Sequence, residues 1–288
     1  RPLVAYVRRE LVALHVGVSV LASTQDVAER PGPFRLAVGG PRPAEDRYEL
    51  RLDHVTCRYP GTEKPVLQNL SLTLRPGEKI AVVGLNGAGK TTLVKLLCGF
   101  YDPDEGRVLL NGQDIRQFDR RAYYKLFSTV AQEISELDIT VAQTVAQAVD
   151  GIDMDKVKAC VEKAGLAETI ASRPQGYDTV VDNDAANLSA GQRQLLTIAR
   201  VFLCDPPIIL LDEATSSVDT RTEVEIGTAM KKLMDGRTSF VIAHRLSTIR
   251  DADLILYMEH GNIIEQGDHQ TLLAKGGAYA ALYYSQFE

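Results

Sequence analysis

Residues 84–91 have the types and spacing needed to bind a chain of phosphates. They read GLNGAGKT and fit the pattern GxxxxGK[ST]. Glycines allow the backbone to wrap closely, so that successive N–H groups point at phosphate oxygens. A helix that begins near Lys90 adds the positive end of its dipole. The Lys90 ammonium then reaches the β- and γ-phosphates, and the Thr91 hydroxyl is offered to Mg²⁺.

The context of this loop supports its interpretation as a phosphate-binding loop. The apolar strand AVV precedes it and the helical stretch TTLVKLL follows, which is the placement that the mechanism needs. The alternative is a glycine-rich turn that carries a lysine by chance. The residues that the interpretation assigns to nucleotide binding are Gly84, Leu85, Asn86, Gly87, Ala88, Gly89, Lys90, Thr91 and Thr92.

A second candidate is the run IILLDE at residues 208–213, an apolar strand that ends in two carboxylates. At a strand end beside a phosphate loop, Asp212 can hold Mg²⁺ through water. Its neighbour Glu213 can take a proton from an attacking water. Alone, the run is also compatible with a strand that meets an exposed turn. Downstream of a phosphate loop, it predicts a site that hydrolyses ATP with Mg²⁺.

The composition favours a globular protein and argues against a nucleic-acid-binding protein or a protein built on zinc or disulfides. The chain has 288 residues, of which 45% are hydrophobic and 24% charged, enough for a sizeable core. Its net charge of -6 gives no basic excess that would point to nucleic acid or an anionic membrane surface. The cysteines form no CxxC pair and no His cluster lies near them, so we expect reduced, mostly buried thiols at Cys57, Cys98, Cys160 and Cys204.

The first 46 residues predict a helix followed by a linker. Apolar residues from Val4 to Leu21 recur three and four apart, which places one apolar stripe along a helix. This helix is either an ordinary surface helix on a core or the end of a longer helix. Residues 31–43 contain four prolines and three glycines and therefore predict a linker. We expect the compact domain to start near Arg47.

From Arg47 onward the pattern predicts an α/β fold. Strands are predicted at 48–56, 67–74, 79–83 and 107–110, a helix at 91–99, and a turn at 111–112. Residues 119–204 have a mostly helical pattern. The run 208–211 predicts another strand, and a βα alternation is expected from residue 239 onward. Strands early, helices in the middle and βα units late indicate an α/β core with an inserted helical part.

One further motif carries a resemblance to a known family. Residues 188–192 read LSAGQ and are followed by RQLL, shortly before Asp212. This closely resembles the ABC signature sequence, and together with the two nucleotide motifs it makes the chain similar to an ABC transporter nucleotide-binding domain over roughly residues 47–288. The resemblance implies a P-loop NTPase (RecA-like) core, an antiparallel β subdomain and an inserted α-helical subdomain.

The resemblance also implies roles for single residues. Tyr59 matches an aromatic residue that stacks on adenine, although a tyrosine at a strand end can simply belong to the core. Gln132 resembles the Q-loop glutamine that contacts Mg²⁺ or water, although it can also be a surface glutamine. His244 matches the switch histidine that holds the γ-phosphate and orients Glu213, unless it is structural. Residues 216–219 match the D-loop.

In the family, the signature residues contact ATP bound by the other subunit, so the resemblance implies a head-to-tail dimer, homo- or heterodimeric, with two shared sites. The signature residues of this chain are Ser189, Gly191 and Gln192. Two departures stand out. Ala190 replaces the usual glycine, and the stretch 180–187 lacks the usual glutamate–glycine elements of the exporter cross-linking loop. Asp182 or Asp184 is a candidate substitute there.

The predicted helix ahead of Arg47 resembles the cytoplasmic tail of the last membrane helix in exporter-type members. We therefore divide the chain into residues 1–46, the end of a truncated transmembrane domain, and 47–288, the ATP-binding domain. The expected location is the cytoplasmic face of the cell membrane, and no nucleic-acid partner is expected. One alternative is a soluble ABC ATPase, against which the lack of tandem ATPase domains argues. Another is a regulatory subunit, which the presence of Glu213 and His244 disfavours.

Overall fold

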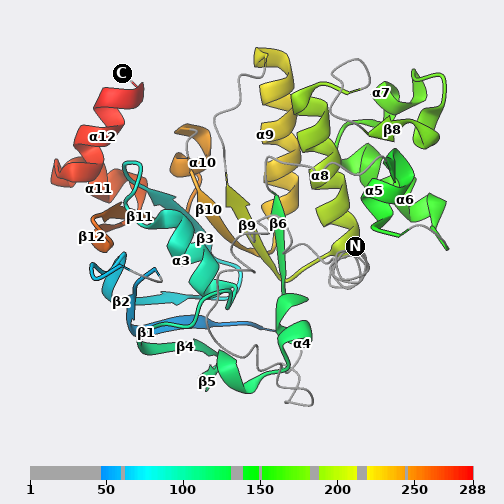
Figure 1. Ribbon diagram of the computed structural model, residues 1–288. Coiled ribbons are helices and arrows are strands. Elements are labelled where there is room, and N and C mark those ends of the chain that lie inside the picture. The colour runs from blue at the N-terminus through cyan, green and yellow to red at the C-terminus, as the bar shows by residue number, and fades with distance from the viewer. Residues whose placement is uncertain are drawn as a thin grey trace. The chain divides into compact units, whose positions relative to one another are not determined.

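A computed structural model describes residues 47–59, 62–130, 139–148, 151–181, 188–212, 219–243 and 246–287 (Figure 1). These residues divide into two compact units. One comprises 128–206 and 219–235, and the other comprises 47–127, 207–212 and 236–287. The predicted N-terminal helix and linker lie outside the described residues.

An antiparallel sheet forms the first part of the larger unit. Its strands are β1 (Leu50–Cys57), β2 (Leu67–Leu74), β4 (Glu105–Leu110) and β5 (Gln113–Asp114), in the order β2-β1-β4-β5. The alternation of polar and apolar residues in β1 and β2 places Leu52, Leu67 and Leu74 fully inside. This sheet is the antiparallel β subdomain that the resemblance implied.

A second sheet carries the central strands, all of which except β6 lie entirely within this unit. It contains β3 (Lys79–Val83), β6 (Phe127–Val130), β9 (Ile208–Asp212), β10 (Thr238–Ile242), β11 (Leu254–Glu259) and β12 (Asn262–Gly267). The order is β12-β11-β3-β10-β9-β6, and β3 pairs in parallel with both β10 and β11. The strands β3 and β10 are nearly continuous apolar runs, as expected for parallel strands that are covered on both faces.

The described part of this unit also contains five α-helices. Helix α3 (Lys90–Leu97) lies between β3 and the antiparallel sheet in Figure 1. The others are α4 (Arg120–Tyr124), α10 (Leu246–Arg250), α11 (His269–Lys275) and α12 (Ala278–Phe287). The buried Glu265 carboxylate on β12 accepts hydrogen bonds from the backbone N–H groups of Ala278 and Tyr279. It thereby satisfies two N–H groups at the start of α12.

The other unit is mainly helical. It contains α5 (Val141–Ala146), α6 (Met154–Lys163), α7 (Ala167–Ala171), α8 (Ala190–Cys204) and α9 (Thr220–Met234). The apolar faces of α5, α6 and α9 pack on α8. Two short strands, β7 (Ile139–Thr140) and β8 (Val180–Val181), pair antiparallel beside them. This unit is the inserted helical part that the pattern predicted.

Two sequence-based expectations need correction. Residues 127–130 were expected to belong to a helical stretch, but they form β6, because four residues with the sequence FSTV are too short to show a period. Residues after 254 were expected to continue a βα alternation. Instead β11 and β12 form an antiparallel hairpin. Its turn at His260-Gly261 has φ of 47° and 79°, which suits a two-residue hairpin turn.

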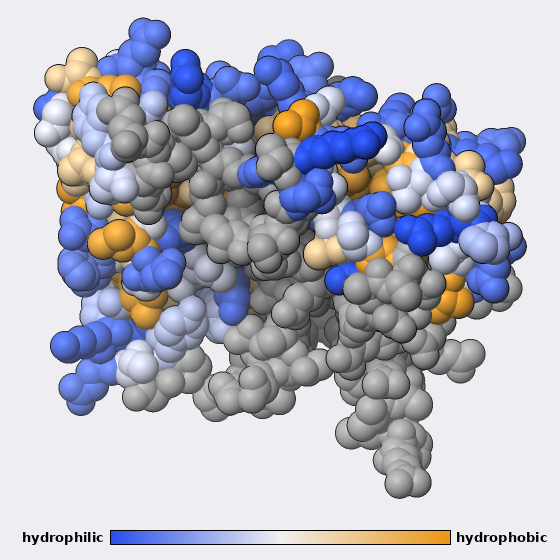
Figure 2. Space-filling view, turned by 90° about the horizontal axis from the view of Figure 1, so that it is seen from above, coloured by the Kyte–Doolittle hydropathy of each residue, from blue (hydrophilic) through white to orange (hydrophobic). Residues whose placement is uncertain are grey.

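Among the described residues on the face in Figure 2, hydrophobic side chains are scattered among hydrophilic ones. The large hydrophobic side chains that are exposed in the described residues are Leu85, Val224, Ile264 and Tyr284. Within the same residues, every helix is too short or too polar to cross a lipid bilayer.

Candidate nucleotide site

The conformation of the phosphate-binding loop depends on three glycines, of which Gly84 and Gly89 belong to the pattern GxxxxGK[ST] and Gly87 stands at a variable position. Gly84, Gly87 and Gly89 have φ of 146°, 80° and 101°, which side chains rarely tolerate. A Cβ on Gly84 would lie 2.2 Å from the carbonyl oxygen of Met258 on β11. A Cβ on Gly87 would meet no atom within 4 Å. Gly84 is thus required by both conformation and space, whereas Gly87 is required by conformation alone.

The β11–β12 turn is hydrogen-bonded to the phosphate-binding loop, a contact that the sequence did not predict. The N–H of Gly261 donates to the carbonyl oxygen of Ala88 at 3.1 Å, and the N–H of Gln68 on β2 donates to the carbonyl oxygen of Gly261 at 3.2 Å. These bonds connect the loop to both sheets. Leu85 and Asn86 at the loop tip are exposed, whereas Ala88 is buried.

Helix α3 begins at Lys90, as the phosphate-binding interpretation requires. Its N-cap is Gly89 in the left-handed conformation, and among the described residues no side chain caps this end. The first N–H groups of a helix that lacks a side-chain cap are suited to bind an anion. Lys90 is 7% exposed, and its ammonium donates to the carbonyl oxygens of Gly84 at 2.7 Å and Leu85 at 3.0 Å. The cation is therefore held directly over the loop.

The two threonines after Lys90 have different environments. Thr91 is exposed, which leaves its hydroxyl accessible for a ligand at the helix start. Thr92 is buried, and its Oγ1 lies 2.8 Å from the hydroxyl oxygen of Tyr59. The structure thus brings Tyr59, predicted to stack on a base, next to the first turn of α3. Tyr59 is half-buried, unlike a core tyrosine.

The carboxyl ends of the central strands meet at the same edge of the sheet. Ile242 at the end of β10 is paired with Val82 of β3 on one side and with Asp212 of β9 on the other. Asp212 is therefore level with the last residues before the phosphate-binding loop, which is the place where a carboxylate can serve a metal-bound phosphate. The other predicted residues of this edge, Glu213 and His244, lie outside the described residues, as does Gln132.

The signature residues lie in the helical unit, at the start of α8. Ser189 is its N-cap: Oγ of Ser189 accepts from the N–H of Gln192 at 3.2 Å, and Oε1 of Gln192 accepts from the N–H of Ser189 at 3.0 Å. This reciprocal pair is a capping box. Gly191 is buried, whereas the methyl group of Ala190 is on the exposed side. The departure at Ala190 therefore does not disturb the packing of α8.

The part of the D-loop that is described also acts as a cap. Asp219 is the N-cap of α9 and accepts from the N–H of Thr222 at 3.0 Å and from its hydroxyl at 2.7 Å. These hydrogen bonds, the one from the Thr222 hydroxyl foremost, hold the pKa of Asp219 below its ordinary value. Residues 216–218 lie outside the described residues.

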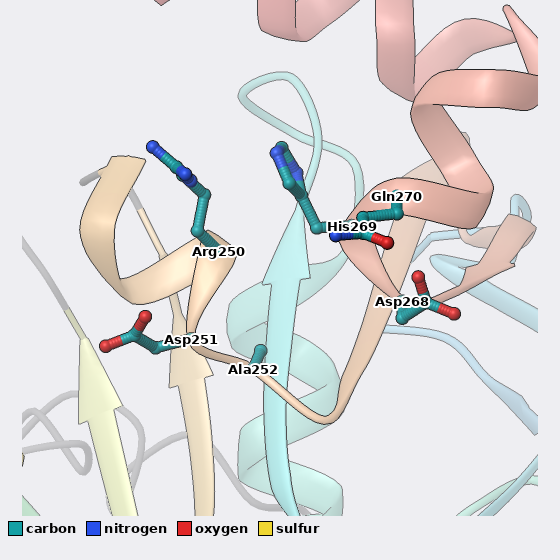
Figure 3. A pocket seen from close by; sticks show the side chains of 6 residues that line it. All are labelled: Arg250, Asp251, Ala252, Asp268, His269 and Gln270. Atoms are coloured by element: carbon teal, nitrogen blue, oxygen red, sulfur yellow. The ribbon is translucent and has the colours of Figure 1, made fainter.

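A pocket of about 450 Å³ lies away from these residues, between the end of α10 and the start of α11 (Figure 3). Arg250 and His269 extend toward the same side in this view. Nδ1 of His269 lies 2.7 Å from the Tyr279 hydroxyl oxygen. Burial, and then the charge of Arg250, lower the pKa of His269. The lining is Arg250, Asp251, Ala252, Asp268, His269 and Gln270, none of them a predicted nucleotide residue.

A strand, a glycine-rich loop and a lysine at a helix start, at the carboxyl edge of a mainly parallel sheet, define a P-loop nucleotide-binding protein. The family model described as ABC transporter matches residues 67–216. The chain belongs to the ABC transporter family, and it is an ATPase domain of that family. The expected fold class is confirmed.

The similar curated proteins are a flippase and a transporter, and both are longer than this chain. An "ATP-dependent lipid A-core flippase" of Burkholderia orbicola is 43% identical over 251 residues, which cover 87% of this chain and 42% of the relative. A "Fatty acid ABC transporter ATP-binding/permease protein" of Mycobacterium bovis is 42% identical over 272 residues, which cover 93% of this chain and 42% of the relative. The chain thus spans less than half the length of these curated relatives.

A solved structure of similar fold contains the nucleotide that the site predicts. It is described as a bacterial Atm1-family ABC exporter with ATP bound, with a TM-score of 0.78 and 37% sequence identity. The match covers 87% of this chain and 44% of that one. The likeness therefore extends over most of this chain.

Proposed function

We propose that this chain is the ATP-driven motor of an exporter, coupling closure of an ATPase dimer to transport across a membrane. The observation that carries the proposal is the phosphate-binding loop. Lys90 and the start of α3, which has no cap from a described side chain and so suits an anion, lie at the edge of the sheet where β9 ends in Asp212. The flippase and the exporter among the similar proteins support the transport step. A soluble ABC ATPase is not favoured, because another relative is named an ATP-binding/permease protein.

In this proposal, each residue of the site has a distinct role. Lys90 and the α3 N-terminus bind the β- and γ-phosphates and neutralise the charge that develops on them. Glu213 orients a water and accepts its proton, and His244 holds the γ-phosphate. Tyr59 stacks on adenine, and Gln132 contacts the metal or its water. Hydrolysis then depends on positioning and charge, without a covalent intermediate.

Mg²⁺ is the metal that the available oxygen donors suit. Hard cations such as Mg²⁺ prefer oxygen ligands. Two residues offer them here: Thr91, whose side chain is exposed at the start of α3, and Asp212, the last residue of β9. When bound, Mg²⁺ would offset the negative charge of the phosphates. Thr91, Asp212 and Gln132 would hold it.

The active form in this proposal is a dimer of two ABC ATPase subunits. Ser189 and Gly191 at the start of α8 contact the γ-phosphate that the partner binds, and Gln192 supports them through the capping box. Residues 1–46 connect residues 47–288 to a transmembrane domain on the same full-length chain. The motor would then work at the cytoplasmic face of the membrane, moving membrane helices as the dimer closes and reopens.

The test is the substitution Glu213→Gln in this chain. It removes the proposed base while retaining a hydrogen-bonding side chain, so ATP binding should be kept. Phosphate release should fall by at least about 100-fold, and an ATP-dependent dimer should accumulate in size-exclusion chromatography with light scattering. A matched control is Glu168→Gln, which removes the same charge from the exposed first turn of α7 and should leave the rate unchanged.

Hydrolysis by Glu213→Gln at the wild-type rate would show that the base is misassigned. Failure of the wild-type chain to bind ATP at all would overturn the function itself. The transport step is tested separately, by ATP-dependent export from vesicles that contain the full-length protein.

A further inference from the structure

Two contacts fix the ring of Tyr59. Its hydroxyl oxygen lies 2.8 Å from Oγ1 of Thr92, which is 3% exposed and belongs to the rigid first turn of α3. The ring of Tyr101 meets it edge to face, with 5.8 Å between the centroids and 84° between the planes. An aromatic ring that is held at its hydroxyl and along one side has little freedom about its two side-chain torsions.

Tyr101 is itself held by α3. The ammonium of Lys95 lies over the Tyr101 ring, 5.6 Å from its centroid, which is a cation–π geometry. Thr92 and Lys95 are three residues apart and therefore neighbours on one face of the helix. The same helix begins with Lys90, which lies over the phosphate-binding loop. One helix thus fixes the phosphate cradle and, through Thr92 and Tyr101, the ring of Tyr59.

We propose that Tyr101 and Thr92 are positioning residues that hold Tyr59 in its base-stacking orientation, and so set the affinity of this site for the adenine part of ATP. This inference rests on the proposed role of Tyr59 in stacking. A platform that is ordered before the ligand arrives loses less conformational entropy on binding. The benefit applies to the base alone, because the phosphate contacts of Lys90 and the helix start do not involve the ring.

The experiment compares binding of ATP with binding of inorganic tripolyphosphate, which has the phosphates but no base. Both are titrated calorimetrically with Mg²⁺ chelated, so that ATP is not hydrolysed. Tyr101→Leu removes the ring but keeps an apolar side chain, and Tyr101→Phe keeps the ring. We expect Tyr101→Leu to weaken ATP binding by about 3- to 10-fold, with tripolyphosphate binding unchanged, and Tyr101→Phe to bind ATP within about 2-fold of wild type.

Tyr59→Phe repeats the comparison at the other contact, because it keeps the ring and removes the hydroxyl that faces Thr92. It should show the same ATP-selective loss, with tripolyphosphate binding unchanged. The double variant Tyr59→Leu/Tyr101→Leu should bind ATP no more weakly than Tyr59→Leu alone, because a positioning residue has no effect once the ring that it positions is gone.

Three outcomes would overturn the inference. Tyr101→Leu could bind ATP as wild type while Tyr59→Leu does not, which would leave the proposed function intact. The variant could lose ATP and tripolyphosphate equally, as a merely structural residue would. The losses of Tyr59→Leu and Tyr101→Leu could be additive, which would show that they act independently. If Tyr59→Leu itself does not discriminate between the ligands, the stacking role in the proposed function fails.

Discussion

At the scale of single residues, the phosphate-binding loop needs glycine for two different reasons, lack of space for a side chain and a positive φ angle. Gly84 is packed against the backbone of β11, with Met258 O where a Cβ would lie, whereas Gly87 faces open space. Backbone atoms cannot move aside as a flexible side chain can. Two glycines of one loop therefore differ in their tolerance of a side chain, depending on the atoms that lie next to them.

The first prediction concerns these two glycines. Gly87→Ala should cost about 1–2 kcal/mol of conformational strain at its positive φ and leave a folded chain that binds ATP more weakly. Gly84→Ala should cost more, because the loop must also move away from β11, and it should abolish ATP binding. Urea denaturation and ATP titration of both variants measure this difference. Equal losses for the two variants would contradict the steric argument.

Sequence reasoning reached the residues of this loop but not their supports. The pattern GxxxxGK[ST] predicted Lys90 at a helix start, and the structure places it there. Met258 and Gly261, which hold the loop from the β11–β12 hairpin, gave no local signal, because their role depends on a strand pairing between residues far apart in the chain. The role of Tyr101 could not be predicted from the local sequence either, because its contact with Tyr59 joins two loops that are far apart in the chain.

At the scale of elements, the helix starts follow two rules. Helices α8 and α9 begin with side-chain caps from Ser189 and Asp219, whereas α3 begins with a left-handed glycine. A side-chain cap uses the first N–H groups for stability. The glycine start of α3 instead has no side-chain cap among the described residues, which leaves the first N–H groups of the helix for the phosphates that are proposed to bind there.

The second prediction concerns the α8 cap. Without nucleotide, Ser189→Ala should lower the free energy of unfolding by about 1 kcal/mol, because the N–H of Gln192 loses its acceptor. Ser189→Thr retains a hydroxyl and should recover most of the loss. The urea midpoints of the variants provide the measurement. A midpoint for Ser189→Ala that equals wild type would mean that the capping box contributes nothing, and the serine would then be needed only for ATP.

The elements with a clear period were predicted best. The strands at 67–74 and 79–83 were predicted with their observed ends, since alternation or a short apolar run bounded by turn residues defines them. The strand β6 was missed because it follows α4 (Arg120–Tyr124) within a few residues and depends on pairing in the sheet. Tertiary context, which the local sequence lacks, decided its conformation.

At the scale of the whole molecule, the residues predicted to bind ATP are divided between the two units. The phosphate-binding loop, Tyr59 and Asp212 belong to one unit, and the signature residues at the start of α8 belong to the other. The cysteines show how both units exclude reactive groups from solvent. All four are free thiols, and Cys57, Cys98 and Cys160 are buried. This confirms the expectation that the cysteines are mostly buried.

The third prediction follows from this burial and concerns stability at alkaline pH. Burial, and then the charge of Asp104, raise the pKa of the Cys57 thiol from 9.0 to about 11. Burial also raises the pKa of Cys98. The folded chain thus keeps protons that the unfolded chain releases above pH 9, so stability is complete below pH 9 and falls as the pH rises toward 11. At pH 10 each buried thiol should cost on the order of 1 kcal/mol.

The measurement is urea denaturation of wild type and Cys57→Ser at pH 8 and pH 10. The serine variant has no ionisable group at position 57, so its own loss between the two pH values should be smaller than that of wild type by about 1 kcal/mol. Comparing the change within each protein removes the effect of the substitution on stability at neutral pH. Equal pH dependence of the two proteins would show that ionisation of Cys57 is not linked to unfolding of the unit that contains β1 and the phosphate-binding loop.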